Sequence, residues 1–314
     1  MKKVVPTLLL VLLVSWPLHA TKYAGEVWSF GNQARYLALG GAGVAVASGP
    51  ASLDWNVAGM LQTTGHHALG FLHGNDFGGL HTTDHLAWVT PTLLGNGTWL
   101  GVGLFLFQSP GIKITELAYN GDSLQEGNPP VVREEVAYRA GALKVGLARR
   151  VHGIEAGLLF KFLYQDAALE AAYGLGLDAG LQWSRPHLRL GVAVHNLLPT
   201  PLFWSTGTRE WIVPSVVLGG AVGVDGFRLL LDLETHFENY GSAAAFSLGA
   251  VSVDPHLGLE WQPHRLLALR AGLDRGNPTF GAGLRYRILS LDYAFLGHSD
   301  LQNSHRVSLT LWLP

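Results

Sequence analysis

The sequence has no cysteine in 314 residues, which excludes both a lipid-modified cysteine anchor and a disulfide-stabilised scaffold. Charged residues are also scarce, at 14%, and the net charge of −2 comes without the basic patch that binds nucleic acid. After residue 20, no apolar run reaches the roughly 18–20 residues that a transmembrane helix needs. No cofactor motif appears, so neither a nucleic acid nor a cofactor is an expected partner.

The first twenty residues have the features of a secretory signal peptide. Lys2 and Lys3 precede an apolar run over 4–14, and the segment ends at the small residue Ala20. The run is too short for a permanent bilayer-spanning helix, although an uncleaved N-terminal anchor is the alternative. We therefore expect residues 1–20 to be removed and the rest of the chain to be exported.

The exported chain is rich in glycine and tryptophan, with 40 and 10 residues, and contains short segments of alternating hydrophobicity. In 188–195 the even positions are Leu, Leu, Val and Val, and the odd positions are Arg, Gly, Ala and His. This period of two is typical of a strand between lipid and a lumen, but also of a strand in a soluble sandwich. The signal peptide and the glycine-rich second face favour an all-β fold, a transmembrane antiparallel β-barrel.

Alternation and turn residues divide the chain into about fourteen strands, an even number as bacterial barrels require. The predicted strands are 66–73, 83–90, 97–107, 134–149, 152–164, 173–183, 188–196, 211–224, 227–236, 244–262, 266–274, 279–287, 289–296 and 305–313. The tight connections, predicted to face the periplasm, are 185–187, 225–226 and 262–264. The long connections, predicted to be extracellular loops, are 108–133, 198–209, 237–243 and 297–304.

The segment 35–61 fits neither a soluble strand nor a soluble helix. Three glycines among small apolar residues are followed by an aromatic–amide pair: Gly40, Gly41, Gly43, Trp55 and Asn56. Glycine at this density weakens an isolated helix or strand, so the segment is ordered only where its surroundings close on the backbone.

This segment resembles the N-terminal hatch of the FadL-like outer-membrane barrels, a superfamily that includes the PorV/PorQ group. The pattern R-x-L-(S/A)-(L/M)-G-G-A-G-(V/T)-A begins at Arg35, and W/Y-N-P-A-G-L begins at Trp55. Val57 replaces the proline of the family pattern, which leaves the local backbone less rigid. The resemblance implies that residues 21–62 form a hatch inside a barrel made by 63–314.

Further motifs resemble the same superfamily and together cover essentially the whole mature chain. They are FKFLY at 160–164, GLDAGL at 176–181, HNL at 195–197, LDYAF at 291–295 and SHRVSL at 304–309. The chain departs from many outer-membrane barrels at its end, which reads Trp-Leu-Pro rather than closing on phenylalanine.

The positions predicted to face the lumen carry nearly equal numbers of basic and acidic residues. The principal members of this set are Asp178, Arg189, Asp232, Glu260, Arg270, Arg285, Asp292 and Arg306. Opposite charges on one inner wall are expected to pair across strands, because an unpaired charge away from water is costly. We therefore favour a structural ion-pair lattice around a plugged lumen over direct contact with a ligand.

Signals for catalysis or metal binding are weak. Five histidines lie between residues 66 and 85, but their spacing matches no known metal site. Serines such as Ser247 and Ser252 have no nucleophile motif around them. The sequence therefore predicts neither a metal site nor an enzyme.

The resemblance implies passive uptake of a hydrophobic small molecule, such as a long-chain fatty acid or an aromatic hydrocarbon. Arg35 and Asn56 would then hold the hatch in register with the wall. The hatch residues expected along the ligand path are Arg35, Gly40, Gly41, Gly43, Trp55 and Asn56.

The PorV/PorQ branch implies an alternative, an outer-membrane component of a type IX secretion system that meets secretion-system or cargo proteins. Its recognition surface would be the long loops, with four exposed residues as contacts: Tyr119, Leu124, Phe203 and Trp204. Both alternatives place the protein in the outer membrane of a Gram-negative type of cell, in contact with membrane lipid.

Overall fold

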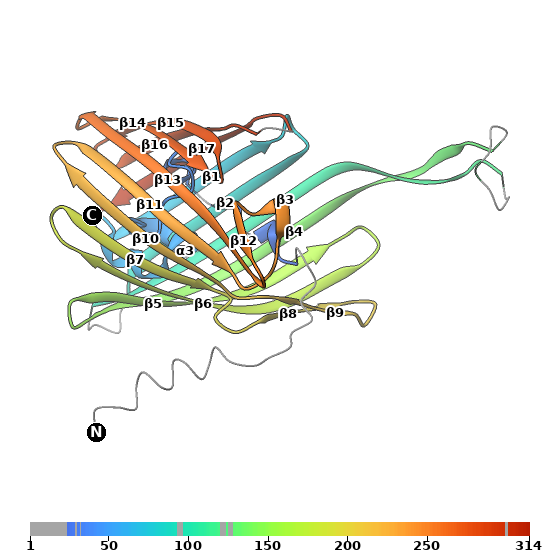
Figure 1. The fold of residues 1–314 in the computed structure, drawn as a ribbon, viewed down its shortest axis with the longest axis horizontal. Coiled ribbons are helices and arrows are strands. Elements are labelled where there is room, and N and C mark those ends of the chain that lie inside the picture. The colour runs from blue at the N-terminus through green and yellow to red at the C-terminus, as the bar shows by residue number, and fades with distance from the viewer. Residues whose placement is uncertain are drawn as a thin grey trace, which may run out of the picture.

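The computed structural model describes residues 24–28, 30–31, 33–92, 97–119, 124, 128–298 and 301–314 (Figure 1). The predicted signal peptide, 1–20, lies outside these residues. The described chain forms a closed antiparallel β-barrel of fourteen strands, which confirms the predicted fold class.

The wall strands follow one another around the barrel in chain order. They are β1 (His67–Asp76), β2 (His81–Pro91), β3 (Thr98–Leu117), β4 (Pro130–Val151), β5 (Ile154–Asp166), β6 (Ala171–Ser184), β7 (Leu188–His195), β10 (Ser215–Val224), β11 (Phe227–His236), β13 (Val251–His264), β14 (Leu267–Asp274), β15 (Asn277–Tyr286), β16 (Leu289–Leu296) and β17 (Ser304–Leu313). The sheet closes where β1 pairs with β17, from His67 opposite Leu313 to Asn75 opposite His305.

The two faces of the wall have opposite chemistry. On β3, Leu104 and Leu106 are 40% and 49% exposed and point outward, whereas Phe105 is 1% exposed and points inward. The same alternation presents leucine, valine and phenylalanine on the outside of most strands and buries small or polar residues inside. An apolar exterior around a more polar interior is the distribution of a transmembrane barrel.

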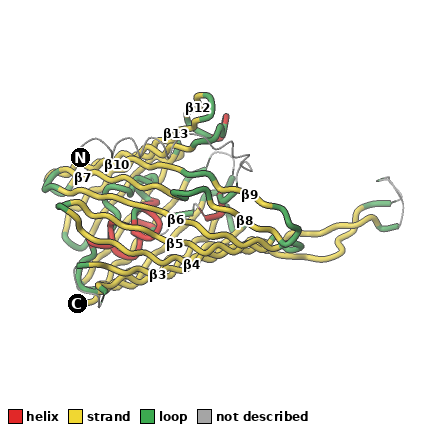
Figure 2. Tube along the Cα trace, turned by 90° about the horizontal axis from the view of Figure 1, so that it is seen from below, coloured by secondary structure: helices red, strands yellow, loops and turns green. Residues whose placement is uncertain are grey.

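Most connections between wall strands are short at one end of the barrel and longer at the other (Figure 2), although only 275–276 join β14 and β15 at the longer end. We call these the short-turn end and the long-loop end. At the predicted turn 225–226, Asp225 has φ +48° and Gly226 has φ +83°, as a two-residue type I′ hairpin requires. The turn predicted at 262–264 lies instead at 265–266, because β13 continues to His264 with a bulge at Pro263, which has no N–H to pair.

The prediction of a long loop over 108–133 is wrong for most of its length. β3 and β4 continue as a two-stranded hairpin that projects beyond the rest of the barrel (Figure 1), paired from Ser109–Tyr138 to Leu117–Pro130. Alternation fades there because both faces of the ribbon meet solvent, so neither face selects apolar residues. Cross-strand apolar pairs, such as Ile112 with Val136, are the strand signal that remains.

Three short strands lie in the connections of the long-loop end: β8 (Thr200–Trp204), β9 (Arg209–Ile212) and β12 (Phe246–Leu248). The expected loop 198–209 therefore contains β8, which pairs with the beginning of β6. The single strand predicted over 211–224 is interrupted after Ile212, where Val213 and Pro214 separate β9 from β10.

The helical turns are η1 (Glu26–Trp28), α2 (Ala34–Leu37), η2 (Gly49–Ala51), α3 (Ser52–Trp55), η3 (Val57–Gln62) and η4 (Gly241–Ala243). None of these described helices has the length and hydropathy that crossing a bilayer requires. α2 to η3 lie inside the barrel (Figure 2), and we call residues 33–62 the hatch.

Candidate functional site

The hatch packs against the inner face of the wall in every direction. α2 contacts β15, β16 and β17, η2 contacts β1 and β2, and η3 contacts β3 to β6. Between α2 and η2, the backbone of Val44 and Ala45 lies against Gly191 on β7 and Gly219 on β10. The hatch therefore fills the middle of the lumen.

Where the hatch meets β13 and β14, backbone packs directly on backbone. Gly40 has φ +67°, and a Cβ there would lie 2.5 Å from the carbonyl oxygen of Leu273. A Cβ on Gly272 would lie 2.3 Å from the amide nitrogen of Gly40. Gly41, with φ +83°, lies against the ring of His256, whose Nδ1 is 2.9 Å from the carbonyl oxygen of Gly40. These positions require glycine.

The third predicted glycine, Gly43, makes room for aromatic side chains. A Cβ there would lie 3.1 Å from both the Trp55 indole and the Tyr36 ring. The Tyr36 hydroxyl donates to the carbonyl of Val46 at 3.2 Å and accepts from the amide of Ser48 at 3.2 Å. Trp55, which was predicted to lie along the ligand path, therefore packs inside the hatch against Gly43 and Tyr36.

Asn56 is the polar centre of the hatch and is 2% exposed. Its side-chain amide donates to the carbonyls of Val44 at 3.0 Å and Leu181 at 2.9 Å, with that of Val192 at 3.3 Å. Its Oδ1 accepts from the amide of Ala58 at 3.2 Å, at the start of η3. One side chain thereby joins two parts of the hatch to β6 and β7.

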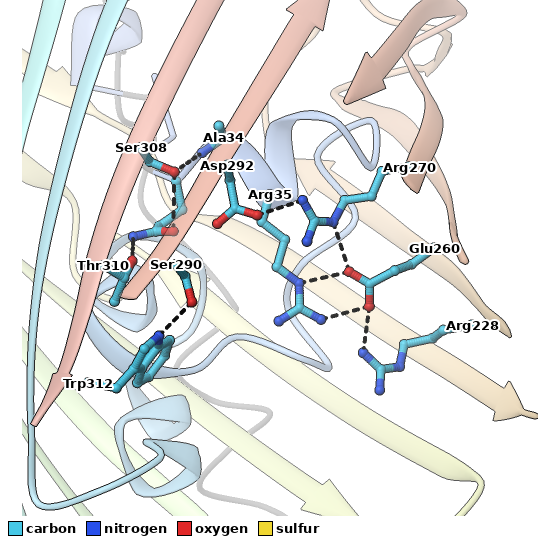
Figure 3. A network of polar contacts seen from close by, with 11 residues as sticks. Ala34, Arg35, Arg228, Glu260, Arg270, Ser290, Asp292, Ser308, Thr310 and Trp312 are labelled. Carbon is cyan, nitrogen blue, oxygen red and sulfur yellow. Dashed lines mark hydrogen bonds and ion pairs between the residues drawn. The ribbon is translucent and has the colours of Figure 1, made fainter. Parts of the chain in front are cut away.

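Arg35 joins α2 to β13 through a charged network (Figure 3). Its Nε and Nη2 donate to the two carboxylate oxygens of Glu260 at 3.0 and 2.8 Å. The same carboxylate accepts from Arg228 at 2.9 Å and from Arg270 at 2.8 Å. Arg270 also donates to Asp292 at 2.7 Å. Three guanidinium groups therefore share one carboxylate, and one of them belongs to the hatch.

Asp232 and Asp178 use different partners from each other. Asp232 accepts from the backbone amides of Gly43 and Val44, both at 2.8 Å, so it binds hatch backbone rather than a basic side chain. Asp178 pairs within the wall, with Lys161 at 2.7 Å and with His195 at 3.4 Å.

Arg306 forms the most deeply buried wall pair of the predicted set. Its Nη2 lies 2.9 Å from a carboxylate oxygen of Asp76, and both side chains are at most 2% exposed. Its guanidinium also lies 5.6 Å from the centre of the Phe30 ring, so the pair faces the N-terminal segment.

Two predicted members lie outside the ion-pair network. Arg285 is exposed and its guanidinium lies 5.2 Å from the Trp312 ring, whereas Arg189 is half-buried. Neither has a carboxylate within ion-pair distance among the described residues. Both lie close to turns at the short-turn end, where water can solvate a charge that has no partner.

The sequence reasoning missed one ion pair in the middle of the lumen. Asp54 on α3 pairs with Lys144 on β4, and His85 Nδ1 lies 4.0 Å from the same carboxylate. The sequence does single out Asp54, because it is the one charged residue between Gly40 and Met60 and would need a partner once buried. Across the described chain, no group of three or more His, Asp or Glu side chains is arranged to hold a metal ion.

One side of the lumen near the long-loop end is lined by a cluster of apolar side chains, and we call this cluster the apolar chamber. His81 and the Asp76–Arg306 pair border it. Its wall residues are Phe105, Phe107, Tyr138, Ala140, Ala142, Leu163, Leu202 and Ile212. The residues that pack against them from the start of the described chain are Ala24, Val27, Trp28 and Phe30. Phe30 stacks on Phe107 with ring centres 5.6 Å apart, and Trp28 Nε1 donates to the carbonyl of Gly141 at 3.1 Å.

No protein-family model and no curated protein sequence matches this chain. Solved structures do match its fold. The Ralstonia pickettii toluene transporter TbuX has a TM-score of 0.59 at 14% identity, covering 90% of this chain and 98% of that one. The Pseudomonas putida toluene transporter TodX has a TM-score of 0.59 at 14% identity, with 89% and 96% covered. A Pseudomonas aeruginosa FadL homologue has a TM-score of 0.54 at 12% identity, with 89% and 97% covered. The chain therefore has the fold of FadL-type channels.

We expect Asn56→Ala to loosen the hatch without opening the wall. The change removes the hydrogen bonds of a buried amide and leaves their backbone partners unpaired, which costs roughly 2–3 kcal/mol. Amide hydrogen exchange over 33–62 should therefore accelerate about 30- to 150-fold, while exchange in the wall strands stays the same.

The matched control is Asn239→Ala, because Asn239 is an exposed loop residue whose amide donates to the carbonyl of Gly249 at 2.7 Å. It should leave hatch exchange unchanged. If both variants behave alike, Asn56 does not hold the hatch in place.

Proposed function

We propose that the protein is an outer-membrane channel for the passive uptake of a hydrophobic small molecule. The observation that carries this proposal is the apolar chamber, a cluster of aromatic and aliphatic wall residues near the long-loop end that only half-buried residues of the N-terminal segment cover. Apolar side chains that face a lumen are stabilised only when apolar groups cover them. In this structure they are covered by Ala24, Val27, Trp28 and Phe30, which we call the N-terminal segment. A hydrophobic ligand could cover them in its place.

The chamber suits exchange between these two occupants. Val27, Trp28 and Phe30 are only half-buried, so their contacts are weaker than those of a sealed core. Burying a large apolar side chain contributes roughly 1.5–3 kcal/mol, and a ligand of similar size would recover a comparable amount in its place. Entry from the long-loop end then requires displacement of this segment, not unfolding of the barrel.

The hatch would act as the second barrier. It is held by separate contacts to different sides of the wall, through Arg35, Asn56 and the amides that face Asp232. A movement that breaks one of these contacts can leave the others intact, so a partial opening costs less than release of the whole hatch. Two of the solved structures that share this fold are toluene transporters, which supports a hydrophobic substrate class.

A charge in the chamber should block uptake. Leu163 is 1% exposed there, and Leu163→Asp would place a carboxylate among apolar groups. In a Gram-negative host without its own importer, we expect uptake of labelled toluene and of a labelled long-chain fatty acid to fall at least tenfold.

Leu163→Met should retain uptake, as should Leu169→Asp, because Leu169 is 73% exposed in the turn between β5 and β6. Wild-type uptake of both compounds no faster than in cells without the protein would contradict the channel proposal.

The projecting hairpin favours one second candidate, a component of a protein secretion system. Tyr119 and Leu124, which follow β3 in the connection to β4, are 69% and 71% exposed. Large exposed apolar side chains on such a projection suit contact with another protein.

The uptake channel and the secretion component predict different effects of shortening the hairpin. Replacement of residues 112–136 by Asn-Gly keeps the wall and removes the projection. A secretion component should lose co-purifying envelope proteins in mild detergent when the hairpin is shortened. For an uptake channel, we expect no specific partner from either form and unchanged uptake.

A further inference from the structure

Two cavities among the described residues open at the short-turn end, opposite the apolar chamber. One, of about 130 Å³, lies between the hatch and strands β13 to β17. The other, of about 280 Å³, lies over β7, β10 and β11. Glu260 and Gln262 line both cavities, so the two are neighbours.

Basic side chains outnumber acidic ones in these cavities. The arginines are Arg35, Arg189, Arg228, Arg265, Arg270 and Arg285. The carboxylates are Asp225, Glu260 and Asp292. Six guanidinium groups therefore face three carboxylates, and the excess positive charge repels itself and attracts anions.

The larger cavity has two arginines placed around an open space. Arg189 on β7 lies opposite Ala221 on β10, and Arg228 on β11 lies opposite Gly223. These two β10 residues are small, so the wall between the arginines carries no bulky side chain, and a Cβ on Gly223 would lie 3.8 Å from Arg228 Nε. The cavity thus exists because β10 has small residues between two long basic ones.

Within the described chain, most hydrogen-bond donors of these two arginines have no protein acceptor. Arg228 donates through Nη1 to Glu260, a carboxylate that Arg35 and Arg270 also bind. Arg189 has no carboxylate within ion-pair distance in the described chain. A guanidinium presents five donors in a fork that matches carboxylate oxygens.

We propose that this cavity binds a small organic anion, a carboxylate held between Arg189 and Arg228. Glu260 shows that guanidinium groups here already hold a carboxylate, and Gln262 and His187 add polar groups to the lining. The volume suits a single-ring or short-chain acid rather than a long chain. The site is separate from the apolar chamber, so it does not depend on the proposed uptake function.

Benzoate and benzamide form a matched pair of probes, equal in shape and different in charge. With the full-length mature protein in lipid-free, non-ionic detergent at pH 8 and low salt, we expect benzoate to bind at least tenfold more tightly than benzamide in calorimetric titration. The preference should shrink as sodium chloride screens the charges.

Arg189→Gln should reduce benzoate binding at least tenfold and leave benzamide unchanged. Gly223→Val, which fills the cavity while keeping both arginines, should also weaken benzoate. Arg149→Gln is the control, because Arg149 is exposed on the outer face of β4 near the same end, and it should bind as wild type does. Equal binding of the two probes, or a benzoate preference that survives both Arg189→Gln and Gly223→Val, would overturn the proposal.

Discussion

Charges buried between hatch and wall need partners inside the barrel, and this constraint organises the middle of the lumen. Arg35 of the hatch pairs with Glu260 of the wall. Asp54 of the hatch pairs with Lys144 of the wall. Removing one member of such a pair leaves a buried charge without compensation, which typically costs 3–5 kcal/mol. The hatch is therefore part of the folded barrel's electrostatics, not a separate domain placed in a finished pore.

The seating of the hatch divides the lumen into two regions of different chemistry. At the glycines, the backbone of the hatch lies directly against the backbone of the wall, so the hatch fills the middle of the lumen. Near the long-loop end, the apolar chamber is covered by the N-terminal segment, and the two cavities at the short-turn end are rich in arginine. A hydrophobic molecule and an anion would thus meet this protein at opposite ends.

Much of the fold could be predicted from the sequence, because period-two alternation reports directly which face of a wall strand meets lipid. It fails where that asymmetry ends, as in the hairpin beyond Gln108, where both faces meet solvent. For the site, the glycine run and Asn56 were identifiable, since a buried backbone contact needs residues of that kind. The partners of each charge were not, because pairing depends on three-dimensional position, so Asp232 was expected to meet a basic residue and meets hatch amides instead.

Photolabelling of the apolar chamber tests the central claim most directly. An aliphatic or aromatic probe that carries a diazirine would be bound to the detergent-purified protein, activated, and located by mass spectrometry with and without excess unlabelled ligand. We predict that the competed labels fall on inward residues, such as Phe105 and Leu163, and that labels on outward Leu104 and Leu106 are not competed. Labels confined to the outward residues, or inward labels that excess ligand does not remove, would contradict a ligand site in the chamber.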